Sequence, residues 1–138
     1  MIAKVISRCV ARAASKGWEK TYWAIDIHGT IMKPNYKVGE ITTEFYPLAK
    51  EVLQALSKRK DIILILYTCS YPHEIQQYLD LFSAGGIHFT YVNENPEVVD
   101  CGYGHYGSKF YFNILLEDKA GFDPYTHWQD IQTFLENS

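Results

Sequence analysis

The chain has 138 residues and a net charge of -3, with 47% hydrophobic and 21% charged residues. This length suits one domain with a hydrophobic core of its own, and the composition is that of an ordinary globular chain. The acidic balance disfavours a dedicated nucleic-acid binder, because such proteins usually carry strongly basic surfaces. The sequence contains no run of 18 apolar residues and therefore predicts no membrane-spanning helix.

The three cysteines, Cys9, Cys69 and Cys101, include no C-x-x-C pair. Their odd number and their spacing disfavour both a disulfide framework and a zinc site. Free thiols are typical of a reducing compartment, and we therefore expect a cytoplasmic protein.

The first 17 residues have the pattern of an amphipathic helix that ends near Gly17. Basic residues recur every four positions, opposite an apolar side, at Lys4, Arg8, Arg12 and Lys16. The simplest interpretation is a helix that docks on the domain with its basic side in water. Organelle targeting and contact with a membrane surface or a partner are the alternatives. We divide the chain into this helix, residues 1–17, and one domain, residues 18–138.

Strand-like and helix-like segments alternate along the rest of the chain. The expected strands are residues 21–27, 62–67, 87–92 and 114–116. Apolar residues at helical spacing predict helices within residues 42–60, with Thr42 or Thr43 as N-cap, within 71–86, and from about Tyr125 to the end. Strands separated by helices indicate right-handed βαβ units. The expected fold class is α/β, a Rossmann-like three-layer sandwich whose mostly parallel sheet has helices on both faces.

Polar residues stand where the expected strands stop, and the carboxyl ends of parallel strands meet at one edge of a sheet. These residues are Asp26 and His28 after the first strand, Thr68 after the second, and Glu117 and Asp118 after the last, which Lys109 precedes.

This set of side chains suits the binding of a phosphoryl group beside a metal ion. Carboxylates that converge repel one another unless a cation lies among them, and oxygen ligands favour Mg²⁺. Lys109 and the Thr68 hydroxyl could bind phosphoryl oxygens, and an aspartate in line with the phosphorus can act as nucleophile.

The order of these motifs resembles the haloacid dehalogenase (HAD) superfamily of phosphohydrolases. It runs from Asp-x-His-Gly-Thr at 26–30 through ILILYTCS at 63–70 and Lys109 to LLEDKAGFD at 115–123. Each motif alone is weak, but four in the right order are specific. The resemblance covers residues 20–124 and implies a Mg²⁺-dependent phosphomonoesterase that forms an aspartyl-phosphate. A response-regulator receiver has a similar set of residues, but there the acidic pair follows the first strand.

By this resemblance, Asp26 is the nucleophile and a metal ligand, and His28 occupies the place of the second aspartate of the first motif. The implied metal ligands are Asp26, Asp118, Glu117 and the backbone carbonyl of His28. We assign phosphate binding to Thr68, Cys69, Lys109 and Gly29. Asp123 either reaches the metal through water or orders its own loop.

His28 departs from the family, whose phosphatases use an aspartate there to move protons. Imidazole could replace it as general acid and base near neutral pH. Alternatively the protein is catalytically impaired and binds phosphoryl groups or a partner. The first interpretation is favoured here.

The chain has no room for the cap domain that most HAD proteins carry. Only 41 residues lie between Asp26 and Thr68, and 40 between Thr68 and Lys109. An open site suits a macromolecular phosphate, or a phosphorylated small molecule covered by a homo-oligomer. Residues 33–40 and 93–107, with Tyr36, Tyr103 and Tyr106, are the loops expected to shape specificity.

Overall fold

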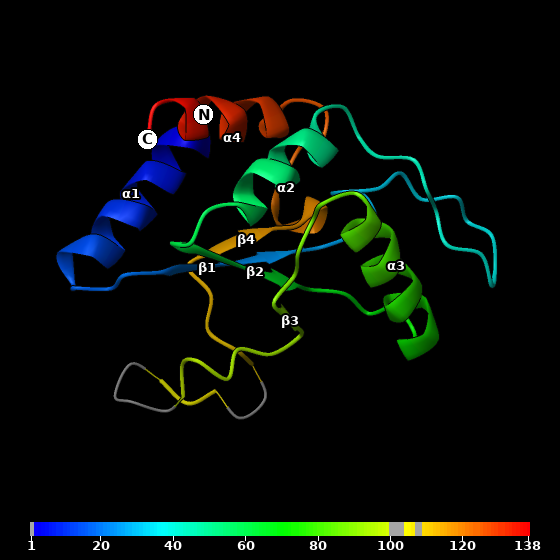
Figure 1. The fold of residues 1–138 in the computed structure, drawn as a ribbon, viewed down its shortest axis with the longest axis horizontal. Coiled ribbons are helices and arrows are strands. Elements are labelled where there is room, and N and C mark those ends of the chain that lie inside the picture. The colour runs from blue at the N-terminus through cyan, green and yellow to red at the C-terminus, as the bar shows by residue number, and fades with distance from the viewer. Residues whose placement is uncertain (1, 100–103, 107–108) are drawn as a thin grey trace.

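The structure, a computed structural model, describes residues 2–99, 104–106 and 109–138 (Figure 1). Its elements, in chain order, are α1 (Ile2–Ser15), β1 (Thr21–Ile25), α2 (Ala49–Ser57), β2 (Ile62–Leu66), α3 (Pro72–Ala84), β3 (Tyr91–Val92), β4 (Ile114–Leu116), a 3₁₀ turn (Asp118–Ala120) and α4 (His127–Glu136).

The four strands form one parallel sheet in the order β3-β2-β1-β4. Trp23 of β1 is level with Leu64 of β2 and Ile114 of β4. This register places the large apolar side chains of neighbouring strands on the same face, because side chains alternate along each strand. The expected α/β class is therefore confirmed, and every strand pair is parallel.

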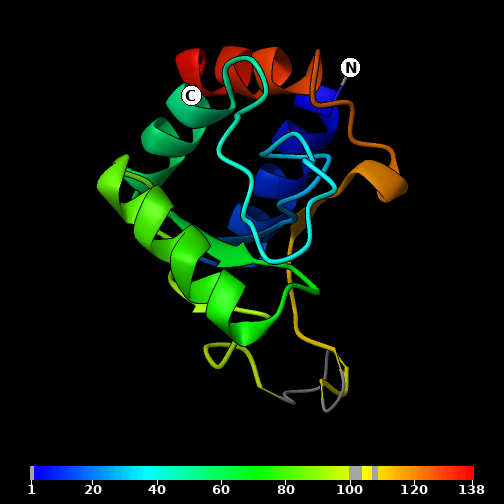
Figure 2. The same ribbon diagram turned by 90° about the vertical axis from the view of Figure 1, so that its right-hand side faces the viewer.

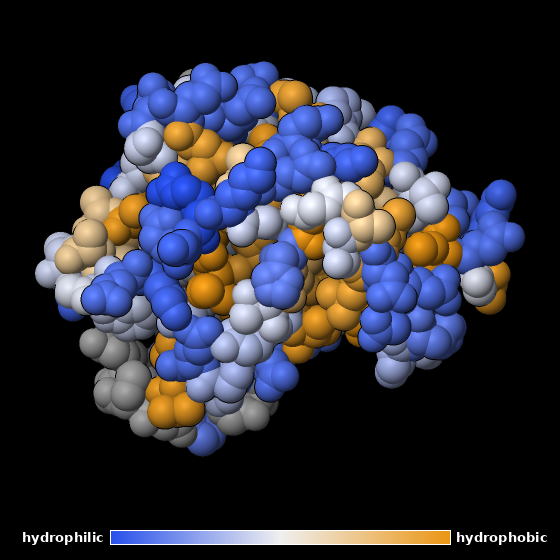
Figure 3. Space-filling model, in the orientation of Figure 1, coloured by the Kyte–Doolittle hydropathy of each residue, from blue (hydrophilic) through white to orange (hydrophobic). Residues whose placement is uncertain are grey.

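Helices cover the face of the sheet that carries Trp23 and Ile25, both fully buried. In Figure 1, α1, α2 and α4 lie above the sheet, and α3 lies beside them. Trp23 contacts Phe134 of α4, and α3 contributes Tyr78 and Phe82 to the same hydrophobic cluster. Figure 3 shows mostly hydrophilic residues on the outer surface of the helical layer. The apolar sides of the helices thus form the main core.

The opposite face carries Ala24 and Ile65, which are also fully buried. The described residues between β3 and β4 lie below the sheet in Figure 1. From this segment, Glu97 accepts a hydrogen bond from the hydroxyl of Tyr22 on β1, and Tyr111 contacts the ring of Tyr22. The Rossmann-like three-layer class is confirmed, with residues 93–99 and 109–113 contributing to the layer on this face, where the sequence predicted helices.

The N-terminal helix packs against α4, with Ile6 and Ala13 buried. It ends at Ser15, and Gly17 has φ of +78°, as expected for a helix stop. The four basic residues of the first 17, Lys4, Arg8, Arg12 and Lys16, are exposed. The simplest interpretation, a docked helix with a basic side in water, therefore fits the structure.

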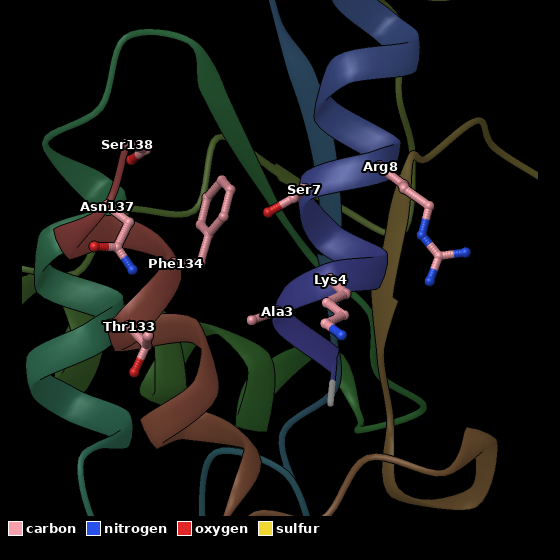
Figure 4. A pocket seen from close by; sticks show the side chains of 8 residues that line it. All are labelled: Ala3, Lys4, Ser7, Arg8, Thr133, Phe134, Asn137 and Ser138. Atoms are coloured by element: carbon pink, nitrogen blue, oxygen red, sulfur yellow. The ribbon is translucent and has the colours of Figure 1, made fainter.

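A cavity of about 410 Å³ opens between α1 and α4 (Figure 4). The side chains of Ser7 and Phe134 point into the space between the two helices, whereas Arg8 extends away from α4. In the described part of the chain, no helix is both long and apolar enough to cross a membrane.

The strands expected at residues 21–27 and 62–67 end slightly earlier, at Ile25 and Leu66, and two other expected elements are much shorter in the structure. Only residues 91–92 of the expected strand 87–92 pair in the sheet, although Ile87 and Phe89 are buried. The helix expected within residues 42–60 spans Ala49–Ser57, and the expected N-cap at Thr42 or Thr43 is wrong. Pro47 disfavours a helical conformation at Tyr46, whose N–H instead donates to the carbonyl of Ile31.

Candidate functional site

A cavity of about 530 Å³ lies at the carboxyl ends of β1, β2 and β4. Figure 2 looks toward this edge of the sheet. The residues that line the cavity follow β1, β2 and β4 or lie at the start of α3. They are Asp26, His28, Tyr67, Thr68, Cys69, Ser70, Tyr71, Glu74, Glu117, Asp118 and Lys119. Six residues singled out in the sequence, Asp26, His28, Thr68, Cys69, Glu117 and Asp118, therefore lie around one cavity.

Three carboxylates form a cluster in this cavity. One oxygen from each of Asp26, Glu117 and Asp118 lies within 4.8 Å of the others. Burial raises the pKa of the Asp26 carboxyl to about 6, and the charges of Glu117 and Asp118 act in the same direction. Burial, together with Asp118, also raises the pKa of Glu117. The cluster therefore brings three acidic groups together, and Lys119 acts in the opposite direction on the pKa of Asp26.

The donor set of this cluster fits Mg²⁺. All three side chains offer hard carboxylate oxygens, and Mg²⁺ is commonly held by one or two carboxylates together with water and phosphate oxygens. A divalent cation would also offset the repulsion among the carboxylates, which adds to the effect of burial on the pKa of Asp26. A metal role for the His28 carbonyl stays a prediction.

The loop after β1 is held against the end of β4. The Asp26 N–H donates to the carbonyl of Leu116 at 3.0 Å. Gly29 has φ of +81°, and a β-carbon there would lie 2.6 Å from Oδ2 of Asp118. A glycine is therefore required for two reasons: the left-handed backbone and the close approach of a carboxylate. Gly29 itself faces Asp118, and its assignment to phosphate binding stays a prediction.

Thr30 joins the two acidic loops, and it is completely buried. Its hydroxyl accepts a hydrogen bond from the N–H of Asp118 at 3.1 Å. Its carbonyl accepts one from the indole Nε1 of Trp128, on α4, at 2.9 Å. The position of Asp118 is thus set through Thr30 by the helical layer.

Thr68, after β2, is buried and is fixed by a residue that the sequence interpretation missed. Oδ1 of Asn93 accepts from the Thr68 N–H at 2.9 Å, and Nδ2 of Asn93 donates to the Thr68 carbonyl at 2.8 Å. The Thr68 hydroxyl also lies 2.8 Å from the Ser70 hydroxyl. Asn93 directly follows β3, so its place at a strand end was the available signal. Ser70 thus places its hydroxyl in the cavity beside that of Thr68.

The lysine that lines the cavity is not the one that the order of the motifs indicates. Lys109 is exposed and is not part of the cavity lining. Its neighbour Phe110 contacts the ring of Tyr67 with centroids 6.0 Å apart. Among the described residues, the lysine that lines the cavity is Lys119, whose charge acts to lower the pKa of Asp26. A phosphate-binding role for Lys109 stays a prediction.

His28 lines the cavity and contacts α3 through one ring nitrogen. Its Nε2 lies 2.8 Å from the hydroxyl of Tyr78, and the two rings meet edge to face. Partial burial lowers the pKa of the imidazole, against the opposing effect of Glu74. The neutral form of His28 is therefore favoured in the structure.

Three other expectations concern residues near the cavity or on the loops. Asp123 accepts from the Tyr125 N–H and the Thr126 hydroxyl, which supports the loop-ordering alternative. Tyr36 is exposed, and Tyr106 is half-buried. Cys101 and Tyr103 lie outside the described residues.

The chain matches no protein-family model, and no curated protein is significantly similar to it. Among solved structures, it is similar to a conserved protein from Bacteroides thetaiotaomicron, with a TM-score of 0.65 and 22% sequence identity. The match covers 86% of this chain and 91% of that one. At this identity the likeness shows the fold.

Proposed function

We propose that the protein is a Mg²⁺-dependent phosphomonoesterase that uses Asp26 as its nucleophile. The observation that carries the proposal is the cluster of Asp26, Glu117 and Asp118 in a cavity that is also lined by Thr68, Ser70 and Lys119. The resemblance of the motifs to the HAD superfamily supports the same activity.

Six of the residues that line the cavity have a place in this reaction. Asp26, Glu117 and Asp118 would hold Mg²⁺, which supplies positive charge for the phosphoryl oxygens when it is bound. The hydroxyls of Thr68 and Ser70 and the ammonium of Lys119 would bind the remaining oxygens.

The chemistry proceeds in two displacements at phosphorus. A carboxylate oxygen of Asp26 forms a bond to phosphorus while the bond to the ester oxygen breaks, and the leaving oxygen takes up a proton from water to become the alcohol. Water then attacks the aspartyl-phosphate, which releases inorganic phosphate and restores the carboxylate.

Phosphate release from a generic aryl phosphate tests the proposal, with the wild-type protein and Asp26→Asn compared with and without Mg²⁺. We expect release by the wild type to need Mg²⁺ and Asp26→Asn to release phosphate at the background rate. Asp80→Asn, an exposed change on α3, is the matched control and should behave as wild type. Equal release by wild type and Asp26→Asn would exclude this activity.

The second candidate function is a catalytically impaired protein that binds phosphoryl groups or a partner. The observation that favours it is the bond between His28 Nε2 and Tyr78, which engages one nitrogen of the group placed for proton transfer. Under this alternative, His28→Asp should raise phosphate release by about 10²-fold or more, since general acid–base catalysis is worth 10²–10⁴-fold. A variant no faster than wild type would count against impairment at this position.

A further inference from the structure

His28 is bonded to a buried tyrosine whose own hydrogen bonds are defined. Tyr78 is 1% exposed, so its hydroxyl has little access to water. The hydroxyl oxygen accepts a hydrogen bond from the backbone N–H of Thr42 at 3.1 Å. A backbone N–H can only donate, so the direction of this bond is fixed. This bond leaves open which group accepts the hydroxyl proton of Tyr78.

The remaining proton of Tyr78 needs an acceptor, because a buried donor without a partner is costly. Within the described residues, the acceptor within hydrogen-bond distance is Nε2 of His28, at 2.8 Å. If His28 donated instead, the Tyr78 oxygen would receive two donors and its proton would have no partner in this part of the chain. Burial raises the pKa of Tyr78, which keeps the phenol protonated and able to donate.

We infer that Tyr78 is a positioning residue that fixes His28 as the neutral tautomer with its proton on Nδ1. In this state Nε2 accepts from Tyr78. Nδ1 makes no hydrogen bond to any described residue, and His28 is exposed at the cavity. The Nδ1–H group is therefore the hydrogen-bond donor that His28 presents to the cavity.

This arrangement gives position 28 a role different from that of an aspartate. A neutral imidazole that accepts at Nε2 and donates at Nδ1 can hydrogen-bond a phosphoryl or ester oxygen. It does not readily release its Nδ1 proton, because that would leave an imidazolate anion. His28 would thus stabilise negative charge on an oxygen rather than transfer a proton. This consequence rests on the proposed phosphatase function, whereas the placement of the protons does not.

Long-range ¹H–¹⁵N NMR of the imidazole tests the inference, under conditions where His28 is neutral. We expect a protonated Nδ1 and an unprotonated Nε2 in the wild type. In Tyr78→Phe the Nδ1–H form should fall from the major to the minor tautomer. Tyr67→Phe, which removes another hydroxyl from the cavity, should leave the tautomer unchanged.

A wild-type protein with its proton on Nε2 would overturn the inference, and so would an unchanged tautomer in folded Tyr78→Phe. The wild-type spectrum decides the tautomer even where Tyr78→Phe does not fold. Titration with inorganic phosphate and Mg²⁺ then separates the two proposals. A shift of the His28 Nδ1–H signal supports its donation to phosphate. The expected tautomer without any such shift would instead argue against the proposed phosphate site.

Discussion

The α-carbon of Gly29 faces the carboxylate of Asp118 so closely that a β-carbon there would lie 2.6 Å from Oδ2. The contact joins the loop after β1 to the turn after β4, and both loops contribute carboxylates to the same cluster. The position of the Asp118 side chain thus depends on the absence of a side chain at position 29.

Gly29→Ala should displace the Asp118 carboxylate and weaken metal binding at least tenfold, measured by calorimetric titration with Mg²⁺. The left-handed backbone adds a loss of stability of about 1–2 kcal/mol. Gly39→Ala is the matched control, because Gly39 has φ of +80° and a β-carbon at that position would meet nothing within 4 Å. The control should lose similar stability and keep its metal affinity. Equal metal affinities in both variants would contradict the role given to this contact.

Asn93→Gly should weaken the binding of inorganic phosphate about fivefold, near the ~1 kcal/mol of one net hydrogen bond, because Thr68 loses its clamp. Asn93 has φ of +54°, so glycine removes the carboxamide without straining the backbone. Tyr36→Gly is the matched control, because it makes the same kind of backbone change, at φ of +56°, at an exposed position. Phosphate affinity that is unchanged in Asn93→Gly would show that Thr68 keeps its position without the clamp.

Lys119→Ala should raise the KM for an aryl phosphate at least tenfold, because an ammonium–phosphate hydrogen bond contributes ~1.5–3 kcal/mol. Lys109→Ala should change KM less than about twofold if the exposed side chain stays outside the cavity on binding. Steady-state kinetics of both variants measures these KM values. A larger effect at Lys109 would favour the lysine that the motif order indicates.

Glu97 gives a pH-dependent contribution to stability. Its pKa is held below the ordinary value by hydrogen bonds from Tyr91 at 2.6 Å and from Lys20 and Tyr22. The ionised form is therefore favoured in the folded state. Its contribution is complete above the ordinary pKa of 4.5 and is lost as pH falls through the lower folded pKa.

Urea unfolding of the wild type and Glu97→Gln over a pH series measures this contribution. The difference in free energy of unfolding should be largest near neutral pH and should shrink in acid. Glu94→Gln, a change at an exposed neighbouring position, is the matched control. A constant difference for Glu97→Gln would mean that its hydrogen bonds do not favour the charged form.

The sequence by itself determined the α/β class and several residues of the cavity. Strand-forming runs with polar residues at their ends identified Asp26, Thr68 and Asp118 because parallel strands bring their carboxyl ends to one edge. The residues around Pro47 were less predictable. Their helical spacing predicted an earlier start for α2, but pairing of Tyr46 with Ile31 and the restriction imposed by proline delayed the helix.

Only the tertiary structure decided how these side chains are held. Asn93 clamps Thr68 from 25 positions away, and Tyr78 contacts His28 across 50 positions. Lys119 rather than Lys109 lines the cavity, since the turn after β4 folds back toward β1. Local patterns report which residues end a strand, because that depends on neighbours in sequence. Which donor meets which acceptor depends on packing between distant segments, and that packing fixed the direction in which His28 presents its proton.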